Sequence, residues 1–207
     1  MPESYPLNLP TAAGISRVVF SAESVVGVTE SPFSFNQQIF RHAGQRWLAQ
    51  ITLPPLTQDQ GEEWASFLLR LRGRFGTFLL GDPASETARG TAGQTPGTPV
   101  LDAANGDSID ITGAPASATG YLKAGDYIQI GSAANARLYK VLEQVNTNGA
   151  GAATLNIWPA FRENAALGSS SIVNNARGLF RLSSNQTDWV INTARTYGVT
   201  FAAEEAL

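Results

Sequence analysis

Cysteine is absent from this chain of 207 residues, and histidine and methionine occur once each. The lack of cysteine excludes disulfide bridges, thiolate nucleophiles and cysteine-ligated metal sites. The single histidine, His42, cannot found a zinc site without further His or Cys ligands. No G-x-S-x-G nucleophile motif or G-x-G-x-x-G nucleotide motif is present. We therefore expect no catalytic residues, no metal and no cofactor, and thus no enzyme.

Charge and long apolar runs are also scarce. Charged residues make up 15% of the chain, against about 25% in an average soluble domain. The 14 basic and 17 acidic residues give a formal net charge of −3 and form no basic stripe, which argues against dedicated nucleic-acid or anionic-membrane binding. No run approaches the roughly 18 apolar residues of a membrane-spanning helix, so we expect no membrane insertion. The opening Met1–Pro6 lacks a signal-peptide pattern, so we expect synthesis in the cytoplasm.

Glycine and proline are plentiful instead, with 20 and 11 residues. Together with frequent Ser, Thr and Asn they indicate short strands joined by turns, so the sequence predicts a mainly β protein. The amino-acid composition changes twice along the chain. Residues 83–172 are rich in Gly, Ala, Thr and Ser, whereas residues 1–82 and 173–207 resemble each other. We therefore predict that both chain ends fold together as one domain and that residues 83–172 form an inserted domain.

The first zone predicts strands around one helix. Runs of β-branched and aromatic residues at 17–20, 33–40 and 46–53 indicate strands, and residues 42–45 are a plausible hairpin connection between the last two. The strand at 46–53 has apolar residues at alternate positions, beginning with Trp47. That period of two predicts a strand with one buried face.

The segment after Thr57 predicts an amphipathic α-helix. Thr57 and Gln60 have the spacing of a capping box, and Gly73 is expected to end the helix in the left-handed conformation. Four large apolar side chains at i, i+3, i+4 and i+7 form one stripe, which should be buried. With Trp47 and Trp189 they make up the predicted structural core. The four residues of the stripe are Trp64, Phe67, Leu68 and Leu71.

The middle of the chain predicts a small β-barrel or sandwich. Residues 86–99 are so rich in Gly, Thr, Pro and Ala that they indicate a mobile connection. Short β-like runs without helical periodicity follow. The predicted strands of this region are 99–102, 108–112, 126–131, 137–145 and 153–158. Three further predicted strands complete the first sheet: 178–182, 189–193 and 198–203.

Two groups of residues are candidates for a catalytic or a binding site. Asp107 and Asp110 lie three residues apart, and a glycosidase needs only two carboxylates. The further ligands of a calcium loop are missing, so we interpret this pair as turn and strand-edge carboxylates. Aromatic residues of the middle zone could form a sugar-stacking surface, with Tyr127 and Trp158 as possible glycan contacts. Core packing of these aromatic rings is the favoured interpretation.

Several segments form a pattern that extends over both ends of the chain. Residues 53–57, 64–74 and 77–83 follow one another in the first zone, and the stretches 155–162 and 182–207 come later. Together they resemble the distal tail proteins, and related minor tail proteins, of long-tailed (siphovirus-like) bacteriophages and gene transfer agents. The pattern belongs to the fold and contains no catalytic motif.

The resemblance implies a β-sandwich with one α-helix, built from both chain ends, that forms a homo-oligomeric ring, a hexamer in this family. It also implies an inserted, outward-facing, barrel-like domain, which in some relatives resembles carbohydrate-binding modules. Such a ring joins the tail tube protein to the tail tip or hub proteins of the virion, and genomic DNA passes through its lumen without specific binding. The alternative function is a carbohydrate-binding accessory module that contacts the host surface.

Overall fold

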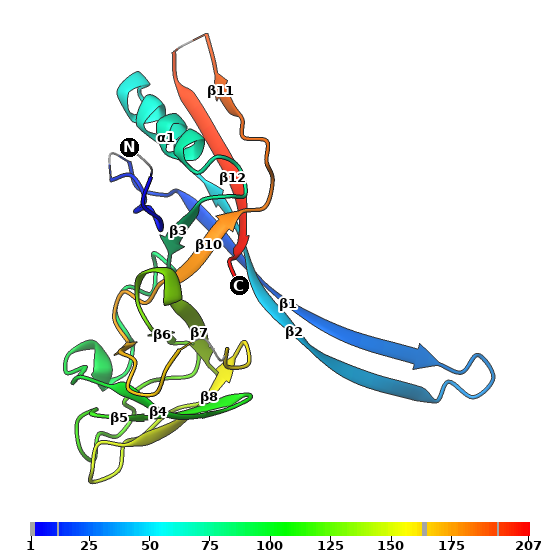
Figure 1. Ribbon diagram of the computed structural model, residues 1–207, viewed down its shortest axis with the longest axis vertical. Helices are drawn as coiled ribbons and strands as arrows, with labels where there is room; N and C mark the ends of the chain where they lie inside the picture. The colour runs from blue at the N-terminus through cyan, green and yellow to red at the C-terminus, as the bar shows by residue number, and fades with distance from the viewer. Residues whose placement is uncertain (1–2, 12, 163–164, 194) are drawn as a thin grey trace.

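The computed structural model describes residues 3–11, 13–162, 165–193 and 195–207. Within these residues the protein is mainly β, with one α-helix and two antiparallel sheets, each of six strands. This confirms the predicted mainly β class with a single helix. Figure 1 shows the two sheets in different parts of the molecule and a long two-stranded ribbon that projects away from both.

The first sheet draws its strands from both chain ends. Its order is β1-β2-β12-β10-β3, and β11 pairs with β12 off this path. β12 lies centrally because it pairs with β2 on one side and β10 on the other. The strands are β1 (Arg17–Glu30), β2 (Gln37–Thr52), β3 (Thr77–Leu80), β10 (Gly178–Leu182), β11 (Trp189–Ile191) and β12 (Tyr197–Glu205).

Helix α1 (Gln58–Arg70) packs beside β12 and has the predicted capping box. The Thr57 N–H donates to Gln60 Oε1 over 3.1 Å, which satisfies an amide that the helix leaves free. After the C-cap residue Leu71, the chain turns through a left-handed Gly73, whose φ is +66°. The whole apolar stripe of the helix is buried against the sheet.

The second sheet has the order β4-β5-β8-β7-β6-β9. An isolated bridge between Val100 and Ser170 joins its two edges, so the sheet curls toward a barrel but forms no closed one within the described residues. Two short 3-10 helices, η1 (Thr91–Gly93) and η2 (Ala133–Asn135), lie in its connections. The strands are β4 (Val100–Asn105), β5 (Ser108–Thr112), β6 (Tyr127–Ile130), β7 (Arg137–Val141), β8 (Ala153–Trp158) and β9 (Ser171–Ile172).

The strands of the second sheet, β4 to β9, all fall within residues 83–172, and the strands of the first sheet all fall outside them. The sheets nevertheless share one apolar cluster. Tyr127 and Leu138 from the second sheet lie in the same buried cluster as Trp47 from the first. The Trp47 indole N–H also donates to the Leu138 carbonyl over 2.9 Å. The division into a two-ended domain and an inserted domain stays a prediction, and the shared cluster means that neither part would be packed completely without the other.

Two sequence-based predictions about connections were wrong. Residues 42–45 are not a turn, because β2 continues through them and the hairpin turn lies at residues 31–36. Residues 86–99 are not a loose connection either. Ala92 is fully buried, and the Asp126 carboxylate accepts hydrogen bonds from the Arg89 and Gly90 amides. Small side chains fit this segment into the second core, so its composition reflects close packing.

A buried ion pair ties the second sheet region to the end of β12. Arg162 Nη2 and Glu205 Oε2 lie 2.7 Å apart, and their side chains are 16% and 2% exposed. The same carboxylate accepts the Trp47 amide over 3.1 Å, and the same guanidinium donates to the Gln45 carbonyl. Removing one partner would therefore leave the other charged group buried and short of partners.

We expect Arg162→Ala to lower the free energy of unfolding by about 2–3 kcal/mol. This lies below the roughly 3–5 kcal/mol typical of breaking a buried pair, because Arg162 retains some solvent access. Chemical denaturation measures the loss. The double variant Arg162→Ala/Glu205→Gln should recover part of it, since the amide needs no counter-charge. Equal losses in the single and double variants would contradict this account of the pair.

Candidate assembly surface

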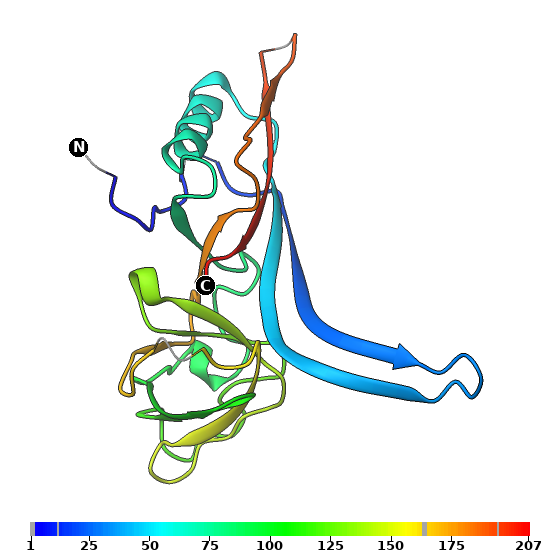
Figure 2. The same ribbon diagram turned by 45° about the vertical axis from the view of Figure 1, so that its right-hand side comes forward.

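The outer parts of β1 and β2, with the turn between them, form a ribbon that we call the arm, residues 24–42. Figures 1 and 2 show it bending away from both sheets and ending far from either. All but two of the residues from 21 to 44 are exposed in the isolated chain. At about 3.3 Å per residue, the seven residues from Ser24 to Glu30 alone reach roughly 23 Å.

The arm is unusually apolar for an exposed element. Of fifteen exposed large hydrophobic side chains among the described residues, seven lie on it. Phe33 at the tip is 96% exposed. A two-stranded ribbon is marginally stable by itself in water, and contiguous exposed apolar surface marks an interaction site. The seven residues are Val25, Val26, Val28, Phe33, Phe35, Ile39 and Phe40.

The strand register sorts the arm into two faces. Val28 pairs with Ile39, and Val26, two residues before Val28, lies on the same face. Thr29 pairs with Gln38, which places these two polar side chains on the opposite face. This face, which we call the aliphatic face, carries Val26, Val28 and Ile39 in its middle part and is bounded by Arg41 at the base and by the Glu30–Gln37 pair near the tip. Val28 and Ile39 are 58% and 64% exposed.

A β-bulge bends the ribbon where it leaves the body. The register shifts between Ser24 and Val26, where Val25 of β1 lies opposite the three residues 42–44 of β2, and such a bulge increases the local bend and twist. Gly44 makes room for the bulge, because a Cβ at that position would lie 2.9 Å from Val25 Cγ2. The direction of the arm is thus built into the pairing.

An ion pair joins the arm to the second sheet. Arg41 donates through Nη1 and Nη2 to both oxygens of Asp107, at 2.7 and 2.6 Å. These hydrogen bonds hold the pKa of the Asp107 carboxyl below its ordinary value. Because that pKa is depressed, the contact is present at neutral pH and is lost as the pH falls through the lowered pKa. Both side chains are exposed, so the pair orients the arm more than it stabilises the fold.

The tip presents two phenylalanines on a tight turn. The Phe35 amide donates to the Ser31 carbonyl over 2.9 Å, and the Ser31 amide donates to the Asn36 carbonyl over 3.0 Å. Phe35 is 73% exposed and has a left-handed backbone with φ +56°. A bulky side chain pays about 1–2 kcal/mol for that conformation. The tip therefore holds exposed aromatic rings at a conformational cost that no internal packing offsets.

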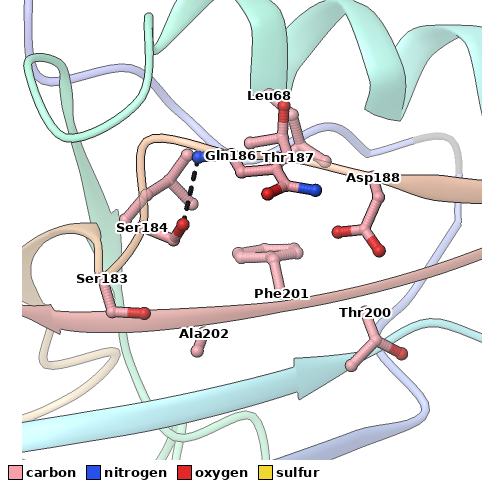
Figure 3. A pocket seen from close by; sticks show the side chains of 10 residues that line it. Leu68, Ser183, Ser184, Gln186, Thr187, Asp188, Thr200, Phe201 and Ala202 are labelled. Atoms are coloured by element: carbon pink, nitrogen blue, oxygen red, sulfur yellow. Dashed lines mark hydrogen bonds between the residues drawn. The ribbon is translucent and has the colours of Figure 1, made fainter.

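A pocket of about 210 Å³ lies between α1, β12 and the loop that precedes β11, and we call it the Phe201 pocket. Figure 3 shows the Phe201 ring at its centre, with Asp188 and Thr187 from the loop before β11 around it. Leu68 of α1 and Leu182 of β10 contribute apolar side chains to the lining. The Phe201 ring also contacts Trp64 and Phe78, so the pocket opens onto the aromatic part of the main core.

Five of the six residues predicted as structural core are buried, and the sixth is partly buried. Trp47, Trp64, Phe67, Leu68 and Leu71 are all buried in one cluster. Trp189 is partly buried and packs against the margin of that cluster. Its strand, β11, pairs only with β12 among the described residues, so one edge of that strand is unpaired.

The two residues considered as glycan contacts do not form an exposed platform. Tyr127 is buried, and its hydroxyl accepts a hydrogen bond from Lys140 Nζ, which also lies 4.2 Å from the centre of its ring. Trp158 is partly buried and meets Trp47 edge to face, with ring centres 4.4 Å apart. Both rings are used in the packing between the two sheets.

The remaining candidate residues are dispersed. Asp107 pairs with Arg41, whereas Asp110 accepts a hydrogen bond from the Thr154 hydroxyl over 2.5 Å. His42 lies on β2 with its ring against Phe40. Among the described residues, no group of three or more His, Cys, Asp or Glu side chains is placed to hold a metal ion. No helix in that part of the chain is long and apolar enough to cross a membrane.

The site that matters most was missed by sequence reasoning. The sequence predicts a strand at 33–40 and a turn at 42–45 and assigns residues 24–32 to no element, so it does not predict a long exposed ribbon. One signal was present: Ser31-Pro32 is a turn-forming pair placed between two apolar runs of similar length. Comparison with known proteins adds no assignment, since no protein-family model and no curated protein matches the chain.

Proposed function

We propose that this chain is a structural component of a long-tailed phage particle, assembled from identical copies into a ring between the tail tube and the tail tip. In this proposal it is made in the host cytoplasm and performs no catalysis. The tail tube protein and the tip or hub proteins lie on either side of the ring. DNA passes through the central channel without specific binding.

The exposed apolar arm is the single observation that carries the proposal. A monomer gains nothing from holding seven large apolar side chains in water on a ribbon that covers no part of its own core. The same surface is useful when another copy covers it, because obligate interfaces resemble a protein core cut in two. The low charge of the chain fits this use, since interface centres are depleted of charged residues.

The arrangement of the chain supports the same function. Both ends meet in one sheet, whereas the second sheet lies to one side with its own core. A scaffold of this kind can present a constant ring-forming part and a separate outward part. The resemblance of residues 53–83 and 182–207 to distal tail proteins concerns the first of these parts.

Electron microscopy of the purified chain tests the proposal. We expect closed rings with a central channel and with the second sheet region on the outside. A chain that remains monomeric at all concentrations and binds oligosaccharides would favour the carbohydrate-binding alternative. That alternative lacks an exposed aromatic platform at Tyr127 and Trp158, so we expect no sugar affinity from these two residues.

A further inference from the structure

The tip of the arm and the Phe201 pocket lie on different parts of the molecule. In both views the arm points away from α1 and β12, which form one side of the pocket (Figures 1 and 2). The tip of one chain therefore cannot enter its own pocket. Two different surfaces that are complementary between copies make a head-to-tail contact, and such contacts close into rings when the rotation allows.

The exposed area of the arm is sufficient for a stable contact. Phe33 and Phe35 at the tip are 96% and 73% exposed. At about 150–250 Å² for each aromatic side chain, these fractions leave roughly 250–420 Å² to be buried. A standard interface buries about 800 Å² on each partner, and the aliphatic face of the arm adds to the aromatic area. A second copy is thus a partner of adequate size.

The pocket has the size and lining to accept a phenyl ring. Its volume of about 210 Å³ exceeds the roughly 150 Å³ cavity that holds benzene in an engineered protein core. Phe201 lies at the centre of the pocket and is 8% exposed, so an incoming ring would meet its accessible edge. Leu68, Leu182 and Ala202 are the other apolar residues of the lining. The remaining six lining residues are polar, as at the edge of an interface: Ser183, Ser184, Gln186, Thr187, Asp188 and Thr200.

We propose that Phe33 of one copy inserts into the Phe201 pocket of the next copy and so links neighbouring subunits. The inference rests on the proposed ring function and specifies how its subunits join. Phe33 is the natural inserting residue because it is the most exposed hydrophobic side chain of the arm and stands at its tip. The strained backbone at Phe35 then serves to hold the tip in its inserting conformation.

Engineered disulfides test this contact cleanly, because the chain has no cysteine of its own. Ser34→Cys lies beside Phe33 on the tip, and Gln186→Cys lies on the rim of the pocket. Mixing the two single variants under mild oxidation should give covalent pairs. The control partner for Ser34→Cys is Ala150→Cys, on an exposed turn of the second sheet region, and it should give at least tenfold fewer pairs. Equal yields with the two partners would overturn the proposed contact.

A second variant measures the energy of the contact. Phe33→Ala should weaken association about 30-fold or more, as expected when the anchor residue of an interface is removed. Ser34→Ala, which leaves both rings in place, should change association less than threefold. An unchanged association constant for Phe33→Ala would contradict the inference.

The possible outcomes separate this inference from the proposed function. Rings that form without Ser34–Gln186 cross-links would overturn the docking of Phe33 and leave the ring function standing. A chain that stays monomeric at every concentration would overturn both. Binding of the chain to phosphatidylcholine vesicles, lost in Phe33→Ala, would assign the tip to a membrane and also overturn the docking.

Discussion

The double variant Val28→Lys/Ile39→Glu is expected to remain monomeric at concentrations at which the original chain forms rings. The two residues pair directly across β1 and β2 and occupy the aliphatic face of the arm. Placing two charges there makes burial against a neighbour unfavourable, because charged groups lose their hydration on burial. Their opposite signs form a favourable cross-strand pair, so the ribbon itself should survive. Light scattering measures the mass of the particles formed.

The matched control puts the same charges on the other face of the same ribbon. Thr29→Lys/Gln38→Glu changes the neighbouring pair, whose side chains are exposed and polar in the original chain. This variant should still assemble. Both double variants should retain the original free energy of unfolding within about 0.5 kcal/mol, as is usual for surface substitutions. Assembly of the Val28/Ile39 variant at the original concentration would remove the aliphatic face from the interface.

Trp64→Ala is expected to lower the free energy of unfolding by about 3–5 kcal/mol. Trp64 is fully buried on α1 and contacts Phe67 and Phe201 edge to face or tilted. Its removal leaves a cavity between the helix and β12, which the rigid sheet cannot fill by collapse. Thermal and denaturant unfolding of the monomer measure the effect.

Two controls separate cavity formation from other effects. Trp64→Phe should cost much less than Trp64→Ala, because it keeps most of the buried area. The indole N–H has no hydrogen-bond partner within the described residues, so replacing it should leave no acceptor there unsatisfied. Leu69→Ala lies on the same helix but is exposed, and it should stay within about 0.5 kcal/mol of the original. An unchanged melting temperature for Trp64→Ala would place this helix outside the core.

The elements predicted best from sequence are those in which local pattern and burial agree. The helix beginning after Thr57 has a capping box, an apolar stripe and a glycine stop, and all three are present in the structure. The strand that contains Trp47 was predicted from alternation because only one face of it enters the core. In such segments the spacing of the buried side chains along the sequence shows whether the backbone is a helix or a strand.

The arm could not be predicted in the same way, because its apolar residues are not arranged for its own core. Val28 and Ile39 are on one face, Phe40 is on the other, and the tip carries Phe33. Alternation of apolar and polar residues predicts a strand only when one face of that strand is buried, and the arm has no face buried in its own chain. In our proposal another copy covers the arm, so the order of its apolar residues would follow a surface that lies outside the single chain.

The Phe201 pocket was out of reach for a different reason. Leu68, Asp188 and Phe201 belong to a helix, a loop and a strand that are far apart in sequence. Phe201 was predicted to lie on a strand, but the pocket around it depends on how the loop at 183–188 runs beside β12 toward β11. Local periodicity carries no information on the path of that loop. The tertiary arrangement of three elements creates this site.

Amide hydrogen exchange along the arm tests most directly whether another copy covers it. In the monomer an isolated ribbon opens readily, so amides of residues 24–42 should exchange quickly. Above the assembly concentration, the account predicts that these amides become protected at least about 100-fold, while those of α1 around Trp64 change little. Rapid exchange of the arm at every concentration, in particles shown to be assembled, would contradict the account.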